Sequence, residues 1–209
     1  MIGIEGVSCT GKTTLAAALA RRLAATMPGP AGEACVVPCY YHAAPDPQVL
    51  SNPDVRDEAG QLAALAALLS VEQLRSQQAR RALGQGRTVV LDRTVDTLLA
   101  HVRGAGRMRG LDAAVPARAL VNAAISRGDV AVPAVTLLLE AGHETLARRA
   151  AARPGLPLLY YDEDFTCGFN GHFTDPITPC CLVIDAAAGA DAVAEQAWGL
   201  LKPYMDGAR

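Results

Sequence analysis

The clearest chemical signal in this sequence is a glycine-rich loop close to its beginning. Residues 6–13 (GVSCTGKT) match the pattern G-x-x-x-x-G-K-[ST], with an apolar run at 1–5 before it and a helix-favouring segment at 13–25 after it. Such glycines let successive backbone N–H groups turn toward one anion, and the N-terminus of the following helix adds positive charge. The pattern therefore predicts a site for nucleotide phosphates, and we expect the nucleotide to be ATP. The residues predicted to contact it are Gly6, Ser8, Cys9, Thr10, Gly11, Lys12, Thr13 and Thr14.

Side chains in and beyond this loop are predicted to act on the transferred phosphoryl group. Lys12 can reach the β- and γ-phosphates, and the Thr13 hydroxyl can ligate Mg²⁺. Asp92 and Arg93 follow a strand predicted at 88–91. There the carboxylate can hold Mg²⁺ or accept a proton, and the guanidinium can bind a phosphate. The competing interpretation of Asp92 and Arg93 is an ordinary ion pair at a strand end.

Two arginines share one face of the helix predicted at residues 144–153. Arg149 and Arg153 are four residues apart, which places them on the same side of a helix. Phosphoryl transfer needs positive charge on the oxygens of the transferred group, and closure of a segment over them excludes water. We therefore predict that both arginines are catalytic and that Arg149 also contacts the donor. The alternative is a solvated basic face.

Candidates for binding the phosphoryl acceptor lie on other segments. Arg75 belongs to a long helical region at 57–83, predicted either as one helix or as two with a break near Ser70. Tyr40 and His42 follow a strand predicted at 34–39 and are expected to line the same pocket. The competing interpretation of Arg75 is a solvated helix face.

The elements that must position these residues alternate between strand and helix. Strands are predicted at 1–5, 34–39, 88–91, 134–139 and 181–184, and further helices at 95–102, 116–126 and 190–201. Short apolar strands alternating with helices are typical of a doubly wound parallel sheet, whose ligands bind at the carboxyl ends of the strands. We expect a single α/β domain over residues 1–209, with five parallel strands and a candidate flap or lid around 144–176.

Three stretches lack a helix or strand pattern. Residues 40–54 contain several prolines and are predicted as an ordered loop. Residues 104–110 (GAGRMRG) are predicted as a basic, flexible turn, and residues 154–179 as a long irregular segment.

Composition argues against several classes of function. The 209 residues carry 19 basic and 21 acidic side chains, a net charge of −2, whereas a general nucleic-acid surface needs a basic excess. We find no uncharged apolar run of about 18 residues that predicts a membrane span, and we expect no secretory leader. The six cysteines are irregularly spaced, which favours reduced thiols over a structural zinc site. These features predict a soluble, cytoplasmic protein.

Together, the motifs resemble those of thymidylate kinases and the related deoxynucleoside kinases. The resembling positions are residues 4–14, 86–93 (GRTVVLDR), 97, 100, 109–112, 134–153 and 183–186. The resemblance implies a P-loop kinase fold with a lid, ATP and Mg²⁺ as cofactors, a small-molecule acceptor and a homodimer. It also implies that His101 lies at the acceptor pocket.

The sequence departs from the thymidylate kinase pattern on the acceptor side. Ser8 stands where that family has an acidic residue, and residues 38–42 (PCYYH) stand where it has an Arg-Glu-Pro stretch. His101 and Val102 replace an aromatic residue and a glutamine, and residues 160–176 replace a helix. The donor side is intact, so the departures leave the identity of the acceptor open.

Three functions are compatible with this pattern. The favoured one is an ATP-dependent kinase that phosphorylates a nucleoside or nucleoside monophosphate. A second keeps the donor site but uses a non-nucleotide acceptor such as a sugar or antibiotic, which the carboxylates of residues 162–164 could bind if it were cationic. The third, less favoured, is a nucleotide-dependent regulator.

Overall fold

Five short apolar segments form one parallel sheet at the centre of the molecule. The strands of this computed structural model are β1 (Ile2–Glu5), β2 (Cys35–Val37), β3 (Val89–Asp92), β4 (Val135–Glu140) and β5 (Cys181–Asp185). Their order is β2-β3-β1-β4-β5, so β1 and the loop that follows it lie in the middle. The predicted five-stranded, doubly wound parallel sheet is confirmed. The structure describes residues 1–46, 50, 55–153 and 162–206.

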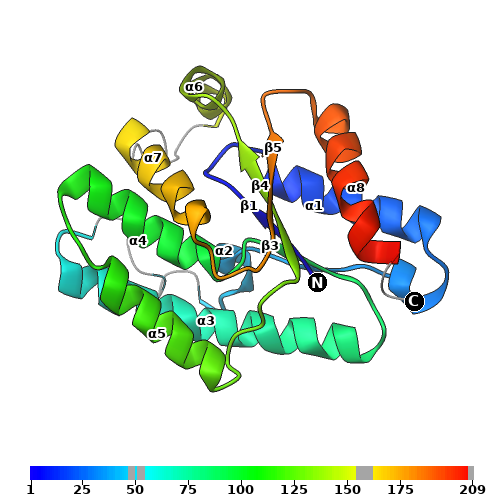
Figure 1. Cartoon of the computed structure of the whole chain (residues 1–209), viewed down its shortest axis with the longest axis horizontal. Helices are drawn as coiled ribbons and strands as arrows, with labels where there is room; N and C mark the ends of the chain where they lie inside the picture. The colour runs from blue at the N-terminus through cyan, green and yellow to red at the C-terminus, as the bar shows by residue number, and fades with distance from the viewer. Residues whose placement is uncertain (47–49, 51–54, 154–161, 207–209) are drawn as a thin grey trace.

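Helices cover both faces of this sheet (Figure 1). Those shown there are α1 (Lys12–Thr26), α2 (Tyr40–Ala43), α3 (Glu58–Gly84), α4 (Asp96–Arg109), α5 (Ala114–Ser126), α6 (His143–Ala151), α7 (Glu163–Gly171) and α8 (Ala190–Asp206). Among the described residues, the 3-10 helices are η1 (Gly29–Gly32) and η4 (His172–Thr174). Among the described residues, no helix is both long and apolar enough to span a membrane.

The two faces of the sheet are buried in separate apolar cores. Ile4 and Val90 pack with α1 and α8 around Trp198, whereas Val89 and Leu91 pack against α3. Successive residues of β3 therefore point to opposite faces, as strand geometry requires. Full burial of such a side chain stabilises the fold by about 1.5–3 kcal/mol, which explains why continuous apolar runs form these strands.

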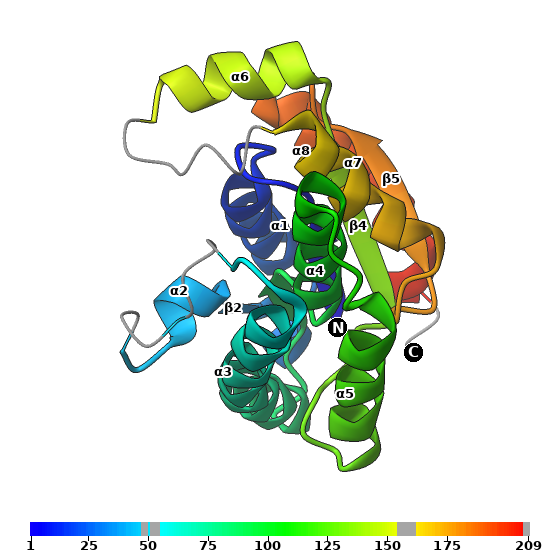
Figure 2. The same ribbon diagram turned by 90° about the vertical axis from the view of Figure 1, so that its left-hand side faces the viewer.

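Helix α4 continues through residues 104–109, so the predicted flexible turn is wrong there, and Gly110 is the left-handed residue that ends the helix. Its glycines permit close packing rather than a turn. A Cβ atom on Gly104 would lie 2.8 Å from Phe165 of α7, and one on Gly168 of α7 would lie 2.7 Å from the carbonyl oxygen of Arg103. The two helices therefore approach each other closely at these glycines, and α4 and α7 lie side by side in Figure 2.

Two further predictions of irregular structure are wrong in part. α7 and η4 lie inside the segment predicted as irregular, of which 154–161 fall outside the described residues. Asp162 caps α7 by accepting a hydrogen bond from the backbone N–H of Phe165 at 2.9 Å, which is a recognisable helix-start signal. α2 interrupts the loop predicted at 40–54, of which 47–49 and 51–54 are likewise outside the described residues. The long helix α3 is continuous, without a break at Ser70.

A buried carboxylate joins the start of α4 to the segment before β5. Asp96 is fully buried and accepts hydrogen bonds from His172 Nε2 at 2.7 Å, from the backbone N–H of Ile177 at 2.7 Å, and from the N–H and hydroxyl of Thr178 at 3.0 and 2.7 Å. Burial alone would raise the pKa of Asp96, but these hydrogen bonds outweigh it and hold the pKa below its ordinary value.

Replacing Asp96 with Ala is expected to lower the free energy of unfolding by about 3–5 kcal/mol, because it leaves the buried donors without an acceptor. Urea unfolding followed by circular dichroism measures this. Asp175→Ala is the matched control: its carboxylate is 72% exposed and pairs with Arg118 at 3.1 Å, so the change should cost less than about 1 kcal/mol. Equal effects of the two substitutions would contradict the assignment.

The same carboxylate gives a pH dependence with a defined sign. Because the pKa of Asp96 is lower in the folded than in the unfolded state, its stabilisation is complete above the unfolded value of about 3.9 and is lost as the pH falls through the folded value. The difference in unfolding free energy between the wild type and Asp96→Ala is therefore expected to shrink below about pH 4. A difference that stayed constant in acid would show that Asp96 does not titrate with unfolding.

Candidate active site

The predicted phosphate loop joins β1 to α1 in an open, curled conformation. Gly6, Cys9 and Gly11 have φ values of 137°, 66° and 98°. A Cβ atom on Gly6 would lie 2.4 Å from the carbonyl oxygen of Leu139, so only glycine fits there. Gly11 caps α1 without a side-chain hydrogen bond, and the first turn of α1 has no acidic residue. The N–H groups at this helix end can therefore bind an anion.

Lys12 is folded inward in the structure. Its Nζ donates a 2.6 Å hydrogen bond to the carbonyl oxygen of Val7, and the residue is 7% exposed. Burial, together with the positive charge of Arg93, lowers the pKa of Lys12 to about 7. A phosphate bound in the loop would favour the charged ammonium, as expected of a residue that serves a ligand.

Thr13 and Asp92, the two predicted metal ligands, lie side by side although 79 residues separate them. The Thr13 hydroxyl donates a 2.7 Å hydrogen bond to Asp92 Oδ2. Asp92 is 3% exposed, and its Oδ1 atom is buried with no hydrogen-bond partner. A hydroxyl and a carboxylate with a spare oxygen are ligands that suit Mg²⁺.

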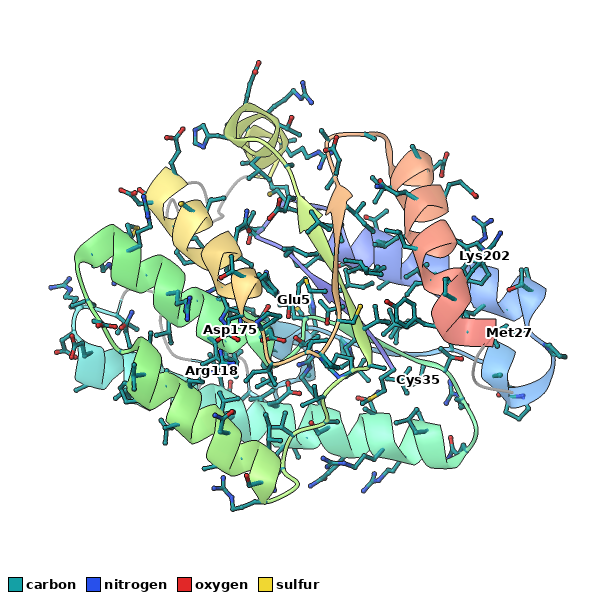
Figure 3. All side chains as sticks on the ribbon, viewed as in Figure 1. Glu5, Met27, Cys35, Arg118, Asp175 and Lys202 are labelled. Carbon is teal, nitrogen blue, oxygen red and sulfur yellow. The ribbon has the colours of Figure 1, made fainter. Side chains whose placement is uncertain are left out.

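Arg93 is linked to a buried acidic residue that the sequence interpretation missed. Arg93 Nη1 donates to the Thr97 hydroxyl at 3.2 Å, and that hydroxyl donates to Glu5 Oε2. Glu5 also accepts from the N–H and hydroxyl of Thr94, at 2.6 and 2.8 Å, near the middle of the molecule (Figure 3). Burial raises the pKa of Glu5, while Arg93 and these hydrogen bonds oppose the rise. Its position in an otherwise apolar strand was the signal available in the sequence.

Arg75, predicted to bind the acceptor, is buried beside the site with its guanidinium bonded to the protein itself. It is 1% exposed and forms an ion pair with Glu72. Its guanidinium donates to the carbonyl oxygens of Pro38, Asp92 and Arg93 at 2.9, 3.0 and 2.6 Å. Because these bonds occupy the guanidinium, Arg75 fixes the backbone beside the site and lines neither of the cavities described below.

The neighbouring Tyr40, also predicted to contact the acceptor, is buried and held by two contacts within the protein. Its ring lies 4.3 Å from the Arg75 guanidinium, and its hydroxyl donates to the carbonyl oxygen of Thr94 at 2.8 Å. His42 is exposed on the same short helix, with Nδ1 3.2 Å from Cys39 Sγ. Cys39, which was not among the predicted site residues, lines the smaller of the cavities described below.

His101, which the resemblance placed at the acceptor pocket, lies on α4 and lines neither of the cavities described below. Its ring packs edge-on against Phe165 and Phe169 of α7, with 5.4 Å between the centroids in both cases. Burial and the charges of Arg93 and Lys12 lower the pKa of His101 to about 3. The imidazole is therefore neutral at physiological pH.

Two adjacent cavities flank the phosphate loop. The larger, about 350 Å³, is bounded by the loop, by Arg149 and Arg153, and by an apolar wall that includes Ala186, Ala188 and Val193. Arg149 donates to the carbonyl oxygens of Cys9 and Ala188, both at 3.4 Å, and so bridges this cavity.

The smaller cavity, about 130 Å³, lies on the other side of the loop. Its lining residues are Ser8, Cys9, Gly11, Lys12, Thr13, Thr14, Cys39, Asp92, Arg93 and Arg153. The structure therefore brings the predicted loop residues together with Asp92 and Arg93. Arg153, which follows α6, lines both cavities.

The acidic residues considered for a cationic acceptor have other contacts. Asp162 caps α7, Asp164 pairs with Arg107 at 3.1 Å, and Glu163 lies 3.7 Å from His143. None of these carboxylates lines either cavity. Six free cysteines are present, with Cys9 and Cys39 at the site.

Comparison with known proteins shows the fold rather than a sequence family. The sequence matches no protein-family model and no curated protein. The structure of deoxyadenosine kinase from M. mycoides with dCMP and a flexible dCDP bound superimposes with a TM-score of 0.67 at 14% identity, covering 97% of this chain and 98% of that one. The same enzyme with dATP gives 0.64 at 14% identity, with coverages of 96% and 98%.

A second enzyme class has the same architecture. The structure of thymidylate kinase from Candida albicans gives a TM-score of 0.69 at 20% identity, covering 98% of this chain and 91% of that one. Both matches span nearly the whole length of each protein. The chain therefore has the P-loop kinase fold found in deoxynucleoside kinases and thymidylate kinases.

Proposed function

We propose that this protein is a Mg²⁺-dependent kinase that transfers the γ-phosphoryl group of ATP to a nucleoside or nucleoside monophosphate. The observation that carries the proposal is the meeting of Thr13 with Asp92 in a cavity that also contains Lys12, Arg93 and Arg153. These are the oxygen ligands and cationic groups that phosphoryl transfer requires.

The larger cavity suits the base and ribose of the donor. Its volume of about 350 Å³ falls within the usual size of ligand sites. Alanine side chains and Val193 provide an apolar surface for a flat base, and Arg149 reaches across from α6. The phosphates would then follow the loop toward the smaller cavity.

The groups around the transferred phosphoryl act by position and charge. Thr13 and Asp92 are the residues that would hold Mg²⁺, and the bound ion would offset the negative charge of the phosphates. Lys12 neutralises oxygens of the β- and γ-phosphates, and Arg153 supplies charge where the two cavities meet. We propose that the segment around 144–176 acts as a lid that excludes water, and that the protein works as a homodimer in the cytoplasm.

The solved structures with this fold support the acceptor class. They are a deoxyadenosine kinase, with dCMP and dCDP or with dATP bound, and a thymidylate kinase. No contact of the described residues favours a sugar or antibiotic acceptor, because the carboxylates of residues 162–164 are engaged elsewhere.

The central test is ADP release from ATP and Mg²⁺ with a panel of nucleosides, nucleoside monophosphates, sugars and aminated antibiotics. We expect release with a nucleoside or its monophosphate, and a roughly 10²–10³-fold lower kcat for Lys12→Ala, because a preorganised cation is removed. Unchanged thermal melting of this variant is the control for folding. Release only with a non-nucleotide would overturn the acceptor class, and normal turnover by Lys12→Ala would overturn the phosphate-loop assignment.

Arg153 is expected to act mainly on the transition state. Arg153→Ala should lower kcat by roughly 10²-fold while changing the Kd for ATP by less than about 5-fold. Arg148→Ala is the matched control, because Arg148 is exposed and lines neither cavity, so steady-state kinetics should show it near the wild type. If Arg153→Ala keeps a normal kcat, Arg153 is not catalytic.

Asp92 is expected to set the Mg²⁺ requirement. Asp92→Asn keeps the size of the side chain but removes its charge, so half-maximal activity should need at least about 10-fold more Mg²⁺. Titration of activity with Mg²⁺ at fixed ATP measures the shift. A Mg²⁺ requirement equal to that of the wild type would remove Asp92 from the metal site.

A further inference from the structure

We propose that Cys39 and His42 form the proton-accepting pair of this site, and that the acceptor is a nucleoside which presents a hydroxyl group rather than a phosphate. The inference rests on the proposed kinase function and narrows its acceptor.

The pair is placed at the acceptor end of the site. Cys39 lines the smaller cavity together with Lys12, Asp92 and Arg93. Cys39 Sγ lies 3.2 Å from Nδ1 of His42, which is exposed at the protein surface. The thiol thus faces the site, while the imidazole connects it to solvent.

The backbone around Cys39 is held on both sides. Arg75 donates a 2.9 Å hydrogen bond to the carbonyl oxygen of Pro38, the residue before it. Tyr40, the residue after it, is 3% exposed and anchored through its hydroxyl to Thr94 at 2.8 Å. Such fixed neighbours keep a side chain in one position, as a catalytic group requires.

The other proton acceptor of the smaller cavity is already committed. Asp92 Oδ2 accepts from Thr13, and the buried, unpartnered Oδ1 is the oxygen left for Mg²⁺. The remaining charged side chains of the lining are Lys12, Arg93 and Arg153, which do not serve as bases beside phosphates. Cys9, the second thiol of this lining, lies within the phosphate loop that binds the donor. Among the described lining residues, Cys39 is therefore the thiol that has a base, His42, beside it and can take the acceptor's proton.

The distribution of positive charge also favours an uncharged acceptor. Lys12, Arg149 and Arg153 lie along the donor path, where the donor's phosphates match them. The charge of Arg93 is offset by Glu5, to which Thr97 links it. No basic residue occurs in the sequence of 47–54 or 154–161. Each cation of the lining is therefore matched by the donor's phosphates or by Glu5, and none remains to bind a phosphate on the acceptor.

The chemical step conserves atoms and charge. The acceptor hydroxyl gives its proton to Cys39 Sγ while the thiol proton moves to Nδ1 of His42, in the tautomer that carries its ring proton on Nε2. The hydroxyl oxygen forms a bond to the γ-phosphorus, and the bond from that phosphorus to the β,γ-bridging oxygen breaks, its electron pair leaving with ADP. The exposed imidazolium then releases one proton to water.

The first test compares free nucleosides with their monophosphates as acceptors for ATP and Mg²⁺, with ADP release as the readout. Turnover with a nucleoside, at least about 10-fold above that with its monophosphate, is the expected result. Turnover only with monophosphates would leave the kinase function standing and overturn this inference. If no acceptor causes ADP release although ATP binding is measured, both the kinase function and this inference are overturned.

The second test addresses the pair itself. Cys39→Ala and His42→Gln are expected to lower kcat about 10²-fold or more, with the KM for ATP within about twofold of the wild type, since a base acts on the chemical step. Cys39→Asp should recover part of the loss by supplying a carboxylate. Cys167→Ala, at an exposed cysteine of α7, is the matched control. If His42→Gln and Cys39→Ala both keep a kcat within threefold of that of Cys167→Ala, Cys39 and His42 are not the base.

Discussion

The buried guanidinium of Arg75 is the contact on which the geometry of the site depends. It joins α3 to the carbonyl oxygens at the ends of β2 and β3, so both strand ends are held at fixed distances. Arg93 has a φ of 73°, a left-handed conformation that is costly for a non-glycine residue and persists only where surrounding contacts enforce it. Because Arg75 bonds to the carbonyl oxygen of Arg93, it stabilises that conformation and the orientation of the functional side chain.

The site concentrates charges that are poorly matched in the absence of a ligand. Lys12 is buried near another cation, Arg93, and its pKa falls to about 7 as a result. Asp92 has a buried oxygen without a partner, and Glu5 is ionisable in the middle of the fold. Without a ligand, groups arranged in this way destabilise the fold. When an anion and a cation are bound, the charges are matched, and this arrangement is common in functional sites.

The wall around His101 owes its shape to packing between α4 and α7, which are far apart in the sequence. Gly104 and Gly168 allow α4 and α7 to approach, and this contact brings Phe165 against His101. The neutral imidazole is therefore part of an aromatic wall. On the opposite side, the short helix α2 brings Cys39 to the cavity. These are the regions in which the sequence departs from the thymidylate kinase pattern.

The sequence by itself determined the sheet, the phosphate loop and the pairing of Asp92 with the loop, because these follow from local signals: apolar strands, glycine spacing and the common carboxyl edge of parallel strands. It was misleading for residues 104–110 and 163–171, where glycines that permit helix packing look like turn residues. It assigned Arg75 and Tyr40 to the acceptor and passed over Glu5 and Cys39. Only the tertiary structure decided the contacts of these four side chains. The partner of a buried polar side chain comes from a segment distant in the sequence, and no local sequence pattern identifies that segment.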